Sequence, residues 1–172
     1  MVEHTSISGE RRGLVARLLR ESYAELLASN SLWKSEIDNW ETYDRDVFNC
    51  PETVGFSLFL TRLDGCIAGF ASWDLRQRPE YGVIGHNCIL PEFRGQGLGK
   101  LQIVEVLRRL QTLGIRTAKV STNDHPFFVP AQRMYTACGF REMRRIPWAG
   151  NPSAMIIEYE MALHAPSTAD EG

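Results

Sequence analysis

The chain has 172 residues and a mass of 19.5 kDa, a size that fits one domain with one hydrophobic core. Its 44% hydrophobic and 23% charged residues exclude a largely disordered chain, and its net charge of -2 argues against a general nucleic-acid binder. No stretch approaches the roughly 18 uninterrupted apolar residues of a membrane span. The first residues also lack the basic and apolar regions of a secretion signal, so the sequence predicts a cytoplasmic protein with no membrane partner.

The first half of the chain predicts a strand and two helices. Residues 2–7 alternate as in a short strand, and Ser8 is a candidate cap for a helix that ends near Asn30. A second helix is expected over residues 32–48, where aromatic side chains alternate with five acids: Glu36, Asp38, Glu41, Asp44 and Asp46. This pattern is typical of a helix with a buried aromatic face and a solvated acidic face. The alternative interpretation is a wall of a substrate pocket.

From residue 56 onward the pattern changes to strands. Two runs, 56–63 and 66–75, flank Asp64-Gly65, a strong signal for a hairpin because glycine accepts the positive φ of a tight turn. A third strand, 81–90, ends at Pro91. A helix is expected over 97–113, with one apolar face made of Leu101, Val104, Leu107, Leu110 and Leu113.

The last part of the chain predicts a strand over 116–122, a short helix over 129–138 and two more strands, from 140 and over 155–161. This order predicts an α/β (α+β) fold, with a mixed, mostly antiparallel central sheet of about seven strands and about four helices. Residues 1–163 then form the domain. The small, polar residues 164–172 are expected to be a disordered tail.

Cysteines and charges give less direct information. Cys50, Cys66, Cys88 and Cys138 lie far apart and form no C-x-x-C pair, so we expect reduced thiols and no metal. Residues 1–60 hold ten acids and six bases, whereas residues 91–145 hold ten bases and four acids. An anionic ligand in the later half is the simplest functional explanation, although dispersed solvated charges account for such counts equally well.

The segment from Ile89 to Lys100 combines a strand end, a glycine-rich turn and a helix start. Backbone N–H groups in such a turn can approach a phosphate, and the new helix adds unpaired donors and the positive end of its dipole. A nucleotide P-loop does not fit, because only three residues separate Gly95 from Gly99 and no hydroxyl follows Lys100. The dinucleotide fingerprint fails as well, since Lys100 stands where it needs glycine.

The turn resembles the R/Q-x-x-G-x-G/A signature of the GCN5-related N-acetyltransferase family, which Arg94, Gly97 and Gly99 match. The segment from Tyr135 to Phe140 is similar to that family's Y-x-x-x-G-F motif. The resemblance covers roughly residues 2–163 and implies acetyl-CoA as co-substrate, without a metal. It implies the following cofactor-binding residues: Cys88, Ile89, Leu90, Arg94, Gly95, Gln96, Gly97, Leu98, Gly99, Lys100 and Asn123. Asn123 is included because relatives carry an asparagine at the position of Phe128, and Asn123 is the candidate to replace its contact.

The resemblance also implies the catalytic residues. Tyr135 is the candidate acid that protonates the departing thiolate. Relatives place a base at positions that correspond here to Gly85 and Val83, and neither can accept a proton. His86 is one residue away and is the candidate base, with His125 as a second candidate. Phe127 and Phe128, beside His125, line a pocket, cover the core or pack in a homodimer; the sequence does not rank these.

The implied reaction is transfer of an acetyl group from acetyl-CoA to a primary amine by direct attack in a ternary complex. The acceptor is a small molecule, a peptide or a protein, and the acids of the second helix suit a cationic amine. Two alternatives remain open. One is a sensor of the same fold that binds acyl-CoA without catalysis, and the other is a nucleotide-binding protein that uses the glycine turn.

Overall fold

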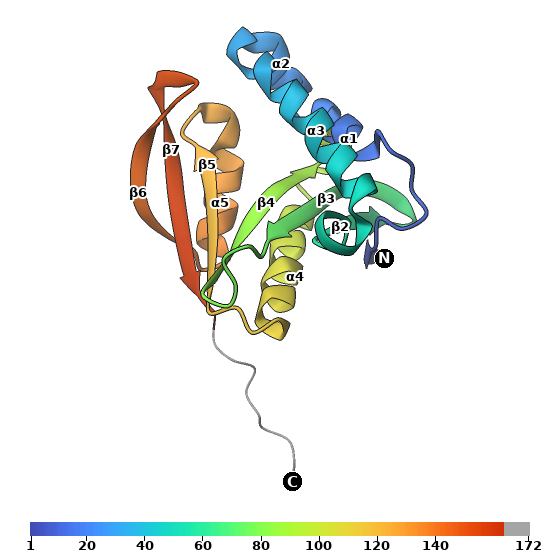
Figure 1. Cartoon of the computed structure of the whole chain (residues 1–172). Helices are drawn as coiled ribbons and strands as arrows, with labels where there is room; N and C mark the ends of the chain where they lie inside the picture. Colours follow the sequence, from blue (N-terminus) through green and yellow to red (C-terminus); the bar gives the residue numbers. More distant parts are fainter. Residues whose placement is uncertain (164–172) are drawn as a thin grey trace. The chain divides into compact units, whose positions relative to one another are not determined.

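The computed structural model describes residues 1–163 and contains a seven-stranded sheet with the order β1-β2-β3-β4-β5-β7-β6 (Figure 1). The β4–β5 pair is parallel, whereas β1–β2, β2–β3, β5–β7 and β6–β7 are antiparallel. The predicted mixed, mostly antiparallel sheet is therefore confirmed. The expectation for residues 164–172 lies outside the described residues. The strands are β1 (Val2–Thr5), β2 (Leu58–Leu63), β3 (Cys66–Asp74), β4 (Tyr81–Ile89), β5 (Thr117–Asn123), β6 (Arg141–Trp148) and β7 (Asn151–Ala162).

Five α-helices and four short helical turns connect the strands within the described residues. The predicted first helix is interrupted at Tyr23, so it forms two helices, and both boundaries of the second predicted helix lie later than expected. The α-helices are α1 (Leu14–Ser22), α2 (Ala24–Ser29), α3 (Glu36–Asn49), α4 (Leu98–Thr112) and α5 (Val129–Ala137). The short turns are η1 (Ser31–Ser35), η2 (Pro51–Gly55), η3 (Pro91–Phe93) and η4 (Pro126–Phe128). None of the helices in residues 1–163 has the length and apolarity to cross a membrane.

The chain forms two compact units, which we describe separately. The first unit contains Met1–Ser72 and His86–Gln102. The second contains residues 73–85 and 103–163. Strands β3 and β4 and helix α4 each contribute residues to both units.

The core of the first unit lies where α1 and α3, which run side by side, pack on β2 and β3 (Figure 1). Leucines recur at three- and four-residue spacing in α1, so one face of this helix is buried. Trp40 from α3 is buried and stacks on Tyr23, with 5.3 Å between the ring centroids. The predicted aromatic face of the second helix is therefore a packing face at Trp40.

One of the predicted solvated acids, Asp44, is instead buried and caps a helix. Its carboxylate accepts hydrogen bonds from the backbone N–H groups of Gly13 (2.8 Å), Val15 (2.9 Å) and Ala16 (3.3 Å). These donors belong to the first turn of α1, where no intrahelical acceptor exists. The predicted start of this helix at Ser8 was wrong: Ser8 bonds Ser6, and the helix begins at Leu14 under the Asp44 cap.

Replacing Asp44 by alanine should lower the free energy of unfolding by about 2 kcal/mol, because three N–H donors at a buried helix end lose their acceptor. Urea denaturation monitored by circular dichroism measures the change. Asp38→Ala is the matched control, since Asp38 is an exposed acid on the same helix. Equal losses in both variants would contradict the capping role.

In the second unit, β5 lies between β4 and β7, and β6 is the edge strand (Figure 1). Ala118 and Val120 of β5 are buried, as are Ile103, Val106 and Leu110 of α4. The predicted apolar face of α4 was only partly right. Leu107 and Leu110 are buried, whereas Leu101, Val104 and Leu113 are 42–48% exposed. The buried face is rotated toward Ile103 and Val106, because helical spacing alone does not choose between two overlapping apolar stripes.

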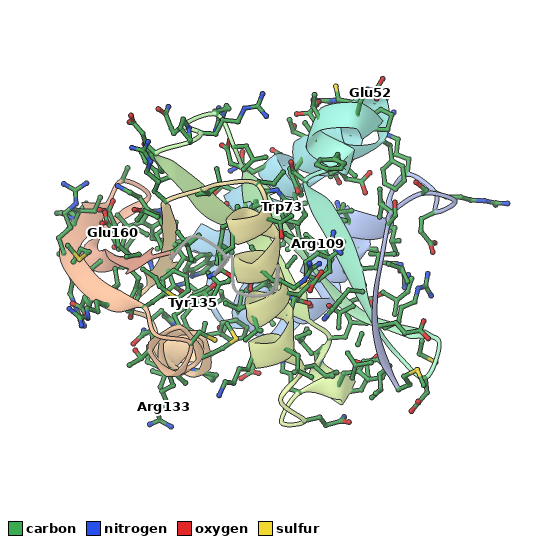
Figure 2. All side chains as sticks on the ribbon, turned by 90° about the horizontal axis from the view of Figure 1, so that it is seen from below. Glu52, Trp73, Arg109, Arg133, Tyr135 and Glu160 are labelled. Carbon is green, nitrogen blue, oxygen red and sulfur yellow. The ribbon has the colours of Figure 1, made fainter. Side chains whose placement is uncertain are left out.

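The solvent side of α4 carries an ion cluster. Glu105 accepts hydrogen bonds from Arg108 and Arg109, and these bonds lower the pKa of Glu105 to about 2 against the opposing effect of partial burial. The Arg109 guanidinium also lies over the Trp73 ring, 5.6 Å from its centroid (Figure 2). The side chains of this segment are thus held by local contacts.

Candidate active site

The glycine-rich turn in the first unit has the open backbone that a ligand requires. Gly95 and Gly97 have φ values of 75° and 78°, which residues with a side chain rarely adopt. A Cβ added at either position would meet no atom within 4 Å. The amide of Leu101 donates to the Gly97 carbonyl (3.2 Å), the first bond of α4. The amides of Leu98, Gly99 and Lys100 precede that bond, so they are donors at the positive end of the helix dipole.

Arg94 ties this turn to its surroundings. Its Nε donates to the carbonyl of Ile89 (3.1 Å), and a terminal nitrogen donates to the carbonyl of Ser22 at the end of α1. The guanidinium thus links the turn to the end of β4 and to α1. This geometry assigns Arg94 a part in shaping the turn.

The end of β4 offers fewer backbone donors than the sequence suggests. The amide of Leu90 donates to the carbonyl of Ala68 in β3 (2.8 Å), so it takes part in the sheet. The Leu90 amide is therefore not available to a thioester carbonyl. The Cys88 side chain is not available to a ligand. It is buried, its Sγ lies 3.8 Å from the Leu18 carbonyl oxygen, and burial raises the pKa of the thiol to about 11.

The half-buried side chain of His86 lies among groups from α3 and β3. The ring of Tyr43 is 4.9 Å from the imidazole ring, centroid to centroid, and Ser72 Oγ donates to the His86 carbonyl (2.8 Å). Burial lowers the pKa of His86, and the nearby Glu36 carboxylate opposes this effect. The imidazole is therefore neutral at neutral pH, which is the form that accepts a proton.

Tyr43 cannot serve as an ionised base at this place. Burial raises the pKa of its phenol to about 12, although a hydrogen bond with Ser72 favours the ionised form. Sequence reasoning missed the grouping of Glu36, Tyr43 and Ser72 around His86. Glu36 and Tyr43 share α3, but no local signal links them to Ser72 on β3 or to His86 on β4.

In the second unit, Tyr135 is buried on the inner side of α5. Its ring centroid lies 5.9 Å from that of Phe140 and 6.0 Å from that of Tyr159. Arg133, on the same helix, points away on the opposite side (Figure 2). Tyr135 is thus held in one orientation by aromatic packing.

Asn123, at the end of β5, has one buried group without a partner. Its Oδ1 accepts from the His125 amide (2.8 Å), whereas Nδ2 is buried and has no hydrogen-bond partner among the described residues. A buried amide donor without an acceptor is unfavourable unless a ligand or water satisfies it. The group fits an incoming carbonyl oxygen.

His125 is a poor candidate for the base. Its Nδ1 accepts a hydrogen bond from the Phe127 amide (3.1 Å) and caps η4. In the neutral ring Nε2 then carries the proton, so neither nitrogen has an unused lone pair. Phe127 and Phe128 belong to this capped turn, and their rings lie edge to face with 5.1 Å between the centroids.

Half of the ten bases in residues 91–145 form ion pairs with carboxylates. These bases bind carboxylates of the same unit, and two of these acids, Glu158 and Glu160, follow residue 145 in the sequence. The pairs are Arg108–Glu105, Arg109–Glu105, Lys119–Glu160, Arg144–Glu158 and Arg145–Glu142. These bases therefore need no anionic ligand to explain their presence. Lys100, at the turn itself, forms no ion pair within residues 1–163.

Comparison with known proteins decides the family. The model of the acetyltransferase (GNAT) family matches residues 11–140, about three quarters of the chain. The chain belongs to the GNAT acetyltransferase family. The resemblance in the turn and in the segment beginning at Tyr135 is thereby confirmed at the level of the family. No curated protein matches the chain by sequence.

Solved structures of GNAT proteins share the fold. A GNAT-family protein from Desulfovibrio desulfuricans superimposes with a TM-score of 0.75 at 16% identity, covering 95% of this chain and 99% of that one. A protein described as a phosphinothricin N-acetyltransferase has a TM-score of 0.71 at 19% identity, with the same coverage. Salmonella typhimurium yncA, described as an acetyltransferase and solved with acetyl-CoA, has a TM-score of 0.67 at 10% identity and covers 100% of this chain and 98% of its own.

No group of three or more His, Cys, Asp or Glu side chains within residues 1–163 is arranged to hold a metal ion. In the first unit, the open amides of the glycine-rich turn leave space for a phosphate such as those of acetyl-CoA.

Gly97→Ala should weaken acetyl-CoA binding at least tenfold, because its Cβ would enter the open side of the turn and disfavour the required positive φ. Isothermal titration calorimetry measures the affinity. Gly65→Ala is the matched control: Gly65 has a φ of 82° and equally open space, but lies in the β2–β3 hairpin. Unchanged affinity in Gly97→Ala, or an equal loss in Gly65→Ala, would remove the turn from the binding site.

Proposed function

We propose that this GNAT protein transfers the acetyl group of acetyl-CoA to a primary amine, by direct attack of the amine in a ternary complex. The observation that carries the proposal is the position of His86, half-buried against Tyr43 on the strand that leads into the glycine-rich turn. A group that accepts a proton is needed for an amine acceptor, which is an ammonium at neutral pH. The N-acetyltransferase description of one similar fold supports the same reaction class.

The residues of the turn bind the co-substrate in this proposal. Amides of Gly95 to Lys100 donate to its pyrophosphate, and the Lys100 ammonium adds positive charge. Arg94 holds the turn against β4 and α1. Backbone groups of Cys88 and Ile89 orient the thioester end, and Asn123 Nδ2 donates to a carbonyl oxygen of the arm.

Two side chains move protons. His86 takes a proton from the ammonium of the acceptor, which leaves the nitrogen lone pair free to attack the thioester carbonyl carbon. Acetyl-CoA supplies an activated acyl group: a C–N bond forms, and the C–S bond breaks. As the amide forms, its nitrogen loses a second proton to solvent. Tyr135 gives its phenolic proton to the departing sulfur and regains one from solvent. Neutral amide and free CoA thiol are the products.

Two measurements test the proposed function. In a thermal-shift screen, acetyl-CoA should raise the melting temperature and ATP and NAD should not, since only a ligand of the native state stabilises it. Release of CoA thiol from acetyl-CoA should then require an amine, tested with a panel of alkylamines, amino acids and peptides. Stabilisation by ATP or NAD alone would overturn the proposal. Binding of acetyl-CoA without thiol release for any amine would favour a sensor.

A further inference from the structure

In the first unit, one face of α3 carries a carboxylate and an aromatic ring and meets the strand of the proposed base. Glu36 and Tyr43 are seven residues apart in α3, which is two helical turns, so both lie on one face of the helix. That face meets β4, because the Tyr43 ring contacts the His86 ring at 4.9 Å. This face therefore carries the Tyr43 ring in contact with the His86 imidazole and, about 10 Å further along the helix, the Glu36 carboxylate, whose charge acts on His86.

Glu36 is the acid of α3 that is available for such a role. Glu41 binds Arg20, Asp44 caps α1, and Asp38 is exposed to solvent. Asp46 is half-buried at the other end of the helix, and Glu36, not Asp46, is the acid whose charge acts on His86. Glu36 is half-buried, accepts one bond from Asn39 Nδ2 (3.3 Å), and is the charged group whose field acts on His86. Its remaining lone pairs can accept from a second cation.

The ring of Tyr43 suits the same ligand. Its phenol stays neutral, so it adds no charge, and an aromatic face attracts an ammonium that comes within about 6 Å. Ser72, which contacts both Tyr43 and the His86 backbone, is the neighbour from β3 and is uncharged. Glu36 is the carboxylate whose charge acts on His86.

We propose that Glu36 and Tyr43 form an ammonium-recognition site beside His86, and that the acceptor is a cationic primary amine selected by this site. That the bound amine is the acetyl acceptor rests on the proposed function, whereas binding of the ammonium does not require catalysis. Glu36 holds the charged amine while His86 removes its proton. Glu36 also acts as a positioning residue for the base, because its charge favours the protonated imidazole that forms.

The test titrates the protein with n-butylammonium, without acetyl-CoA, and follows the ring signals of His86 by NMR. His86→Ala identifies those signals. Saturable shifts are expected in the unmodified protein, and the apparent dissociation constant should rise at least fivefold in Glu36→Gln. The pKa of His86 should also fall in that variant, since the opposing charge is lost. 1-Butanol, which has the same chain without charge, should cause no saturable shift.

Asp38→Asn is the matched control, because it removes a carboxylate from the same first helical turn but from the exposed face. It should leave both the affinity and the pKa of His86 unchanged. The inference is overturned if butylammonium does not shift His86, or if the two variants behave alike. Thiol release with the amine panel separates the two proposals. Release that is insensitive to Glu36→Gln removes this site and keeps the function, whereas ammonium binding without release keeps the site and removes the function.

Discussion

Gly69→Ala should lower the free energy of unfolding by about 3 kcal/mol, which corresponds to a fall in melting temperature of roughly 6–12 °C. A Cβ at this position would lie 2.0 Å from the carbonyl oxygen of Cys88 and 3.0 Å from Cα of Ile89. Both contacts are backbone atoms, so no side-chain rotation relieves them. Strand β3 would have to move away from the end of β4.

Gly82→Ala is the control for the Gly69 substitution. Gly82 is also a buried strand glycine, but its added Cβ would meet Leu110 Cδ2 at 2.8 Å, which is the end of a flexible side chain. A cost of about 1 kcal/mol is expected there. Thermal denaturation of both variants measures the difference. Equal stabilities would show that the close approach of Gly69 to Cys88 is not required.

Gly69 also has a predicted consequence for activity. The atoms that its Cβ would displace belong to Cys88 and Ile89, the backbone proposed to orient the thioester. Gly69→Ala should therefore lower turnover at temperatures where the variant remains folded, whereas Gly82→Ala should not. Circular dichroism at the assay temperature confirms that the comparison is made on folded protein.

Tyr135→Phe should lower turnover at least tenfold while acetyl-CoA affinity stays nearly unchanged. The substitution removes only the hydroxyl, and the ring packing against Phe140 and Tyr159 is retained. A proposed acid that protonates the leaving sulfur acts mainly in the transition state, so its loss reduces kcat more than binding. Steady-state rates of thiol release, together with calorimetric binding of acetyl-CoA, measure the two effects.

Tyr159→Phe is the matched control for Tyr135. Tyr159 is a second buried tyrosine of the same unit, and burial raises the pKa of its phenol. Loss of its hydroxyl should change turnover by less than about twofold, because no role in proton transfer is proposed for it. Unchanged turnover in Tyr135→Phe would remove Tyr135 from the mechanism, as would an equal loss in both variants.

The strands, most of the helices and the family could be predicted from the sequence because their signals are local. Asp64-Gly65 indicated the β2–β3 hairpin, and the glycines of 95–99 indicated a turn that opens a helix. Both depend on φ values that the residue type itself controls. The burial of α4 was predicted less well, because Leu101 and Leu107 both fit helical spacing and only packing determines which side is covered.

The sequence by itself determined the glycine-rich turn, the tyrosine motif and the family, since short motifs carry their own backbone conformation. Only the tertiary structure decided how the charged side chains are used. Asp44 caps α1, Lys119 and Arg144 form ion pairs with carboxylates of β7, and the charge of Glu36 acts on His86. The physical reason is that these interactions join residues that are distant in sequence. A count of charges along the chain cannot show which of them folding brings close enough to interact.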